Sequence, residues 1–147
     1  SVRAFGDVVR GKLTGDGTRT VAFSVPHGDH THDYTADIAQ TGNLPRIVPA
    51  RIGADLRWQG NQWRAGVGAI RSDRQDDVAE FEDASGGYTL VHANLAWHLD
   101  TAGGTALELF VDGHNLLDED ARPHTSFLRE LAPLPGRGVT AGVRVFF

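Results

Sequence analysis

The sequence predicts an all-β fold: an antiparallel up-and-down meander of about six long strands. Apolar and polar residues alternate with a period of two in several stretches of roughly ten residues, and helical periodicity is nearly absent. Short connections rich in glycine, asparagine and glutamine alternate with long ones. Because short turns join antiparallel neighbours, this alternation indicates a sheet with tight turns at one end and long loops at the other.

Six segments have the alternation of strands with one apolar and one polar face. They cover residues 1–9, 49–58, 62–70, 88–99, 105–115 and 137–147. The first is the weakest, because Phe5 and Val9 break its parity, and the last is regular to its end. The apolar positions are Val2, Ala4, Val8, Ile52, Ala54, Leu56, Trp58, Trp63, Ala65, Val67, Ala69, Val91, Ala93, Leu95, Trp97, Leu99, Leu107, Leu109, Val111, Val139, Ala141, Val143, Val145 and Phe147.

The connections between these strands differ in length. Short turns are expected at Gln59–Gln62 and Asp100–Gly104, where QGNQ and DTAGG have hairpin chemistry. Long irregular connections are expected at Leu13–Val48, Ser72–Gly87 and Leu117–Gly138. The second contains an acidic stretch that we expect to be a solvated loop, and TSFLREL in the third predicts a short helical turn.

The two faces of the predicted sheet suit a membrane better than water. The polar face carries many ionisable side chains, whereas the apolar face is thin and rich in alanine and valine. Trp58, Trp63 and Trp97 share the apolar parity beside the short turns, and Phe147 lies at the same end, as in an interfacial aromatic girdle. These features are typical of an outer-membrane β-barrel. A soluble β-sandwich with a wet outer face is the alternative.

Composition limits the classes of function. One domain is the default for 147 residues. The net charge of −5 and the absence of a basic block disfavour nucleic-acid binding. The absence of cysteine excludes disulfides and zinc–thiolate sites, and no run approaches the roughly 18 apolar residues of a membrane helix. No G-x-S-x-G or HExxH motif occurs, so we expect no enzyme.

The C-terminal third resembles a known family. The stretch FVDGHNLLDEDARPHTSFLRELAPLPGRGVTAGVRVFF is similar to the end of a TonB-dependent outer-membrane receptor, with a penultimate strand running into GHNLLDEDAR, a loop closing with APLPGRG and a last strand ending in phenylalanine. GNLPRIVPARIGADLRW resembles the passage that leads into the last five strands. The resemblance extends over residues 42–147, and PHTSFLRELAPLPGR is most similar to the zinc-uptake branch.

The resemblance implies a place in the cell and a set of partners. Family members have a barrel of about 22 strands filled by a plug, so we expect residues 1–147 to be the C-terminal part of a transmembrane β-barrel, with the plug domain and earlier strands absent. It implies the Gram-negative outer membrane, with short turns in the periplasm and long loops outside. The implied partners are membrane lipid, the missing plug and strands, the inner-membrane TonB complex acting through the plug, and the barrel-assembly machinery, which would recognise Phe147.

The stretch VPHGDHTHDY is the candidate metal site. His27, His30 and His32 offer imidazoles, and Asp29 or Asp33 could add an oxygen ligand for zinc or another divalent metal. The alternative is a flexible polar loop in which histidines cluster by chance. His124, in the last connection, could complete the site or could pack within its own loop.

The expected function is therefore uptake of a metal, with zinc as the first choice, or of a metal chelate, and this segment supplies barrel wall and extracellular loops. The metal is cargo, and no cofactor is expected. Two alternatives stay open: an iron-siderophore receptor, and a stand-alone soluble β-domain that binds metal through its histidines. A small structural barrel is a weaker option, because about six strands fall short of the known range.

Overall fold

The computed structural model describes residues 1–101 and 104–147, and every regular element in them is a β-strand. The strands are β1 (Val2–Asp7), β2 (Lys12–His27), β3 (His30–Asn43), β4 (Arg51–Gln59), β5 (Trp63–Ser72), β6 (Tyr88–Asp100), β7 (Ala106–His114) and β8 (Gly138–Phe146). The all-β prediction is thus confirmed. In the described ranges, no helix has the length and apolar character needed to span a membrane.

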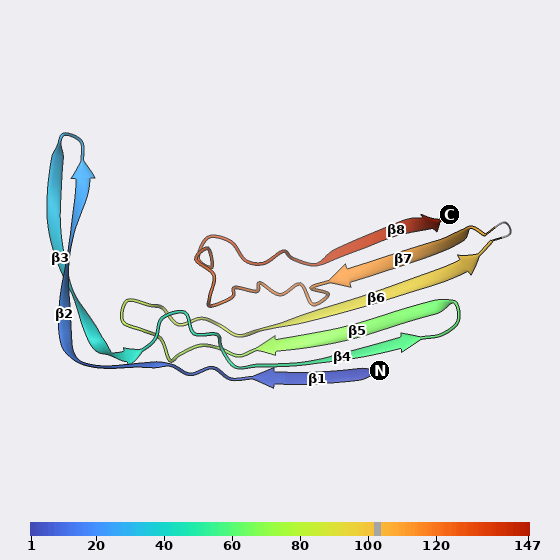
Figure 1. Cartoon of the computed structure of the whole chain (residues 1–147), viewed down its shortest axis with the longest axis horizontal. Helices are drawn as coiled ribbons and strands as arrows, with labels where there is room; N and C mark the ends of the chain where they lie inside the picture. The colour runs from blue at the N-terminus through green and yellow to red at the C-terminus, as the bar shows by residue number, and fades with distance from the viewer. Residues whose placement is uncertain (102–103) are drawn as a thin grey trace.

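The predicted meander is present as one six-stranded sheet in the order β1-β4-β5-β6-β7-β8, with every neighbouring pair antiparallel. Long connections lie at one end of the sheet and short turns at the other (Figure 1). The turn at Gln59–Gln62 is closed by the Gly60 N–H, which donates to the Trp63 carbonyl at 2.8 Å. Of the turn predicted at Asp100–Gly104, residues 102 and 103 lie outside the described residues. The sheet is open, with β1 and β8 at its edges.

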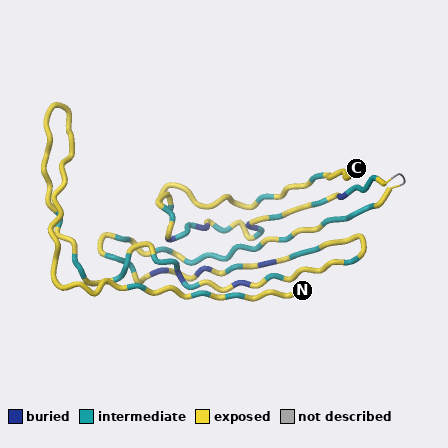
Figure 2. The backbone as a smooth tube through the Cα atoms, in the orientation of Figure 1, coloured by how far each residue is buried: buried dark blue, intermediate teal, exposed yellow. Residues whose placement is uncertain are grey.

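The prediction of an irregular connection over Leu13–Val48 is wrong. Strands β2 and β3 pair there as a long antiparallel hairpin, so the described chain has eight strands rather than about six. The hairpin lies beyond the long-connection end of the sheet, runs across the direction of its strands in this view, and is exposed over most of its length (Figures 1 and 2). The signal in the sequence is the alternation of Val21, Phe23 and Val25 with the smaller Ala22 and Ser24, a strand pattern weakened by the glycines, histidines and aspartates around it.

The six-stranded sheet has no apolar core on either side. Its apolar parity positions are exposed or half-buried, with Leu56 52% and Val143 61% accessible, and Ala121 in a connection is the one fully buried apolar residue of the described part. Glu108, by contrast, is only 4% accessible although it lies on the polar face. Most polar-face side chains are exposed as well, so both faces of the sheet are largely open, whereas a water-soluble sheet buries its apolar face.

The acidic connection between β5 and β6 is more than the solvated loop that its charge predicts. Glu80 accepts a hydrogen bond from the Ala39 N–H at 3.1 Å, and Glu82 accepts one from the Arg46 N–H at 3.0 Å. The Asn43 side chain donates to the Val78 carbonyl at 3.2 Å. Since these groups belong to the end of β3 and the segment after it, the acidic connection holds the base of the hairpin.

The segment predicted as a short helical turn, Thr125–Leu131, forms consecutive turns and no helix. The Leu131 and Ala132 N–H groups both donate to the Leu128 carbonyl, at 2.9 and 2.7 Å. Proline at position 133 has no N–H and cannot continue such a ladder, which limits the segment to single turns.

Candidate functional site

The three clustered histidines lie at the tip of the β2–β3 hairpin. His27 pairs with His30 across the two-residue turn Gly28–Asp29. Gly28 has a φ of 61°, which a side chain disfavours and which the first central position of a type II′ hairpin turn requires. The sequence HGDH thus closes the hairpin and places two of the histidines directly opposite each other.

All three histidines face the same side of the hairpin. Directly opposed residues of an antiparallel pair share a face, and Val25 pairs with His32 just as His27 pairs with His30. The His27 and His32 ring centroids are 6.4 Å apart. Further along, Phe23 and Tyr34 stack with centroids 5.7 Å apart, and the His32 ring lies 6.4 Å from Tyr34. The tip is therefore an imidazole cluster that continues into an aromatic pair.

The two aspartates of the predicted metal site differ in position. Asp29 lies in the turn between the histidines, whereas Asp33 has the opposite parity and accepts a hydrogen bond from the Ser24 hydroxyl at 2.5 Å. Asp33 is thus directed away from the imidazoles. No three His, Cys, Asp or Glu side chains of the described part stand close enough together to hold an ion. To bind one metal ion together, the three histidine side chains would have to rotate toward each other. They are exposed, so there is room for this rotation.

His124 does not lie with the hairpin tip. Its side chain is buried, with Nδ1 2.9 Å from the Ser85 hydroxyl and 2.7 Å from Nη1 of Arg129. Because a guanidinium only donates, Nδ1 accepts and the ring proton sits on Nε2. Nε2 is 3.2 Å from a Glu82 oxygen, outside hydrogen-bond geometry. The structure thus places His124 in the packing of its own connection, which was the alternative to a metal role.

Burial and neighbouring charges set the protonation of this pair. Burial lowers the pKa of His124 and the Arg129 charge lowers it further, while the Glu82 carboxylate opposes both and does not prevail. Burial raises the pKa of Glu82. Hydrogen bonds from the Ala79 and Arg46 N–H groups, together with the charges of His124 and Arg129, lower it by more, so the pKa of Glu82 is lowered overall. Near neutral pH the connections are thus joined around a neutral imidazole and a charged carboxylate.

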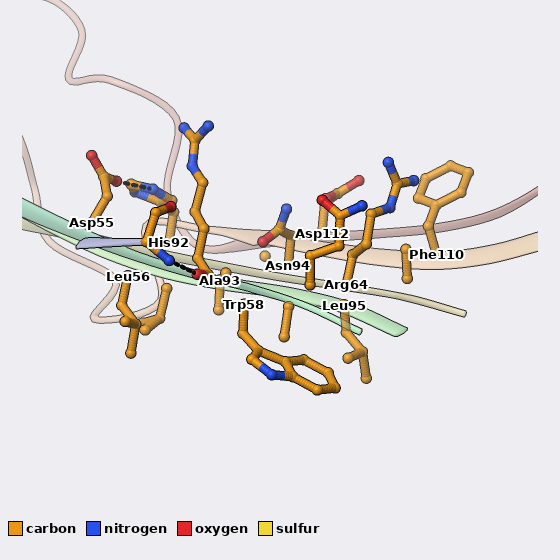
Figure 3. A pocket seen from close by; sticks show the side chains of 18 of the residues that line it. Asp55, Leu56, Trp58, Arg64, His92, Ala93, Asn94, Leu95, Phe110 and Asp112 are labelled. Atoms are coloured by element: carbon orange, nitrogen blue, oxygen red, sulfur yellow. Dashed lines mark hydrogen bonds and ion pairs between the residues drawn. The ribbon is translucent and has the colours of Figure 1, made fainter. Parts of the chain in front are cut away.

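The polar face of the sheet forms a second candidate site, a shallow hollow of about 900 Å³. Figure 3 shows polar side chains on one side of the strands and Leu56, Trp58 and Leu95 on the other. Asp55 of β4 and His92 of β6 meet across β5 at 3.2 Å. Gly68 lies between them in register, and a Cβ there would be 2.3 Å from the Asp55 carboxylate. The ion pair therefore depends on a glycine in the middle strand.

Glu108 is the organising residue at the short-turn end of this face. Its carboxylate forms ion pairs with Arg144 of β8, at 2.6 Å, and with Arg64 of β5. The Arg144 guanidinium also lies over the Phe110 ring, 4.2 Å from its centroid. Sequence parity gave the face of each residue, but it could not indicate that one carboxylate from β7 would join arginines of two other strands. Both guanidiniums remain half exposed and present positive charge to the hollow.

The aromatic residues predicted to form a girdle lie on the expected face. Trp63 and Trp97 are paired in register and stack with ring centroids 5.5 Å apart. Trp58 lies beside the same turn and reaches to within 3.0 Å of the Cβ position of Gly60. Phe147 follows the end of β8 and is fully exposed. The short-turn end of the sheet therefore combines a tryptophan pair on one face with the Glu108 cluster on the other.

Comparisons with known proteins do not identify a family. No protein-family model matches the chain, and no curated protein gives a significant match.

The His124 environment predicts a pH-dependent stability. Its folded pKa lies below the ordinary value of about 6.5, so the unfolded chain takes up the proton first as pH falls. Stability should be constant above about pH 7 and should decline below about pH 6.5. Glu82, whose pKa is lowered from 4.5, should not contribute in that window. Denaturant unfolding between pH 8 and 5.5 should show this decline, and His124→Gln should flatten it. An equal slope in the variant would contradict the assignment.

Gly68 is predicted to be needed for the Asp55–His92 pair. In Gly68→Ala the added methyl group would overlap both side chains and force them apart, at a cost of about 1–3 kcal/mol. The matched control is Gly86→Ala, since a Cβ at Gly86 meets nothing within 4 Å. The urea midpoint should fall in the first variant and stay within error in the second. Equal midpoints would show that the two side chains do not need this glycine.

Proposed function

We propose that this chain forms part of the wall of an outer-membrane β-barrel of the TonB-dependent receptor type, in a Gram-negative cell. The observation that supports this most is the distribution of side chains on the two faces of the six-stranded sheet. Its apolar face is exposed, and its polar face holds a carboxylate at 4% accessibility between two arginines. Lipid would cover the first face, and the lumen with its plug would meet the second.

The two faces of the sheet need different surroundings. A water-soluble sheet gains stability by burying its apolar side chains, and here Leu56, Val143 and the other residues of that parity have no layer over them in the described ranges. A lipid bilayer supplies that cover without a second sheet. The tryptophans at the short-turn end fit the interfacial level, where an aromatic ring can meet both lipid and water.

The proposed partners meet the sheet at its two edges and at its C-terminal residue. The open edges of β1 and β8 would pair with other strands of the barrel, because an unpaired edge in lipid leaves backbone polar groups unsatisfied. The barrel-assembly machinery would recognise Phe147. The inner-membrane TonB complex would act through the plug. The role is transport, and the chain itself catalyses no reaction.

The proposed cargo is a metal ion, with zinc first, or a metal chelate. In this orientation the β2–β3 hairpin leaves the sheet at the extracellular end and carries His27, His30 and His32 on one face. Imidazoles on one face of an exposed tip can weakly bind a metal ion of intermediate softness, such as zinc, and release it to a site of higher affinity. An iron siderophore is the competing cargo, and uptake measured with both substrates separates the two.

A pair of lysine substitutions tests the membrane orientation. Val143→Lys places a charge on the apolar face, and Thr140→Lys places the same charge on the opposite face of the same strand; both positions are exposed. If lipid covers the apolar face, Val143→Lys should cost about 2–4 kcal/mol and reduce the folded protein in the outer-membrane fraction. Thr140→Lys should behave as the parent. Equal tolerance of both charges, or a protein that fractionates with soluble material, would support the soluble alternative.

Radiolabelled zinc uptake in zinc-starved cells that carry the gene tests the cargo. Replacement of His27, His30 and His32 by alanine should lower uptake several-fold at limiting zinc, because each loss removes a ligand. The matched control is Thr31→Ala with Asp33→Ala, on the opposite face of the hairpin. Ferric siderophore uptake is measured alongside. Zinc uptake that is unchanged by the histidine variant, or entry of the iron chelate alone, would reject zinc capture by this hairpin.

A further inference from the structure

We propose that the hollow at the base of the β2–β3 hairpin is a binding site for a phosphate group, and that the phosphate belongs to an amphiphile. The hollow has a volume of about 160 Å³ and is formed by three segments: residues 8–12, residues 43–50 and the start of the β5–β6 connection. The phosphate site stands independently of the proposed function, whereas its lipid source rests on the apolar face being covered by lipid.

The hollow has a fixed frame. The Leu44 N–H donates to the Gly11 carbonyl at 3.1 Å, and the Asp73 N–H donates to the Ala50 carbonyl at 2.9 Å. The Gln75 side chain, which is largely buried, donates to the Ile47 carbonyl at 3.3 Å. Each of the three segments is therefore tied to another, so the walls of the hollow do not depend on a ligand for their position.

Gly11 fixes the chain that carries two of the cationic side chains. A Cβ at Gly11 would lie 2.7 Å from a methyl carbon of Leu44 and 3.1 Å from one of Ile47. The backbone thus packs against these two side chains as only glycine allows. Arg10 and Lys12, on either side of Gly11, both line the hollow and are both exposed.

The charges around the hollow favour an anion. Arg10, Lys12 and Arg74 line it together with one carboxylate, Asp77. Arg74 is ion-paired with Asp76 at 2.7 Å, whereas Arg10 and Lys12 have no ion-pair partner in residues 1–101 and 104–147. The whole chain has a net charge of −5, so this excess of positive charge is confined to the surroundings of the hollow. A phosphate monoester carries about −1.5 to −2 charges and three acceptor oxygens, enough for both a guanidinium fork and an ammonium group.

The apolar part of the lining indicates the source of the phosphate. Val8 and Val9 line the same hollow and are 67% and 46% accessible. Val8 directly follows β1 and has the sequence parity of Val2 and Ala4, a position that would set the hollow beside the apolar face at its long-connection end. A phosphate headgroup held by Arg10 and Lys12 would leave its acyl chain along that face. Free phosphate would gain only the polar half of these contacts.

The test uses the full chain in dodecyl maltoside micelles, with bound ligand counted by native mass spectrometry. The probes are dodecyl phosphate, inorganic phosphate and uncharged dodecanol. Arg10→Gln with Lys12→Gln should weaken dodecyl phosphate binding at least tenfold. Arg19→Gln with Arg57→Gln removes the same charge at exposed positions outside the hollow and should leave binding unchanged. Circular dichroism of each variant establishes that it is folded.

The outcomes separate the parts of the proposal. Dodecyl phosphate bound equally by parent and Arg10/Lys12 variant, or lost equally in both double variants, would overturn the site. Inorganic phosphate bound as tightly as dodecyl phosphate, and lost with Arg10 and Lys12, would overturn the lipid source in favour of a soluble phosphate. A failure of the proposed barrel function would be seen instead in the lysine pair at Val143 and Thr140, which leaves this hollow intact.

Discussion

The two-residue period of the antiparallel sheet is the constraint on which the rest of the structure depends. Once the strands pair in register, every second side chain lies on the same face of the sheet. A shift of the pairing by one residue would move the apolar side chains of that strand to the polar face and its polar side chains to the apolar face. This commitment places Leu56 and Val143 on an uncovered apolar surface and Glu108 under two arginines on the other. The exposed apolar face and the buried carboxylate are consequences of the same pairing.

The long-connection end of the sheet adds contacts that the strands alone do not supply. Glu82 accepts hydrogen bonds from Arg46 and Ala79 and faces the buried imidazole of His124. Arg46 also donates to the Thr125 carbonyl at 3.4 Å and covers the Phe127 ring. The base of the hairpin, the acidic connection and the last connection therefore hold one another through charged groups.

The functional features are distributed by this arrangement. The imidazole cluster lies at the far end of the hairpin, and the hollow lined by Arg10 and Lys12 lies at its base. The Glu108 cluster lies at the opposite end of the sheet, beside the short turns. In the proposed orientation these become, in turn, an external capture point, a site near the outer-leaflet headgroups and a lumenal surface near the periplasm. Their separation follows from the strands running in one layer.

The sequence by itself determined the all-β class, the six-strand meander, the membership of each face and the position of the tryptophans, because all of these follow from a period that is local in the chain. Only the tertiary structure decided that the Leu13–Val48 connection is a hairpin, since its strands are stabilised by pairs such as Phe23 with Tyr34. It alone set Asp33 apart from the three histidines, buried His124 beside Glu82 and joined Glu108 to two arginines. Such contacts depend on register between residues far apart in sequence, which parity within one strand does not specify.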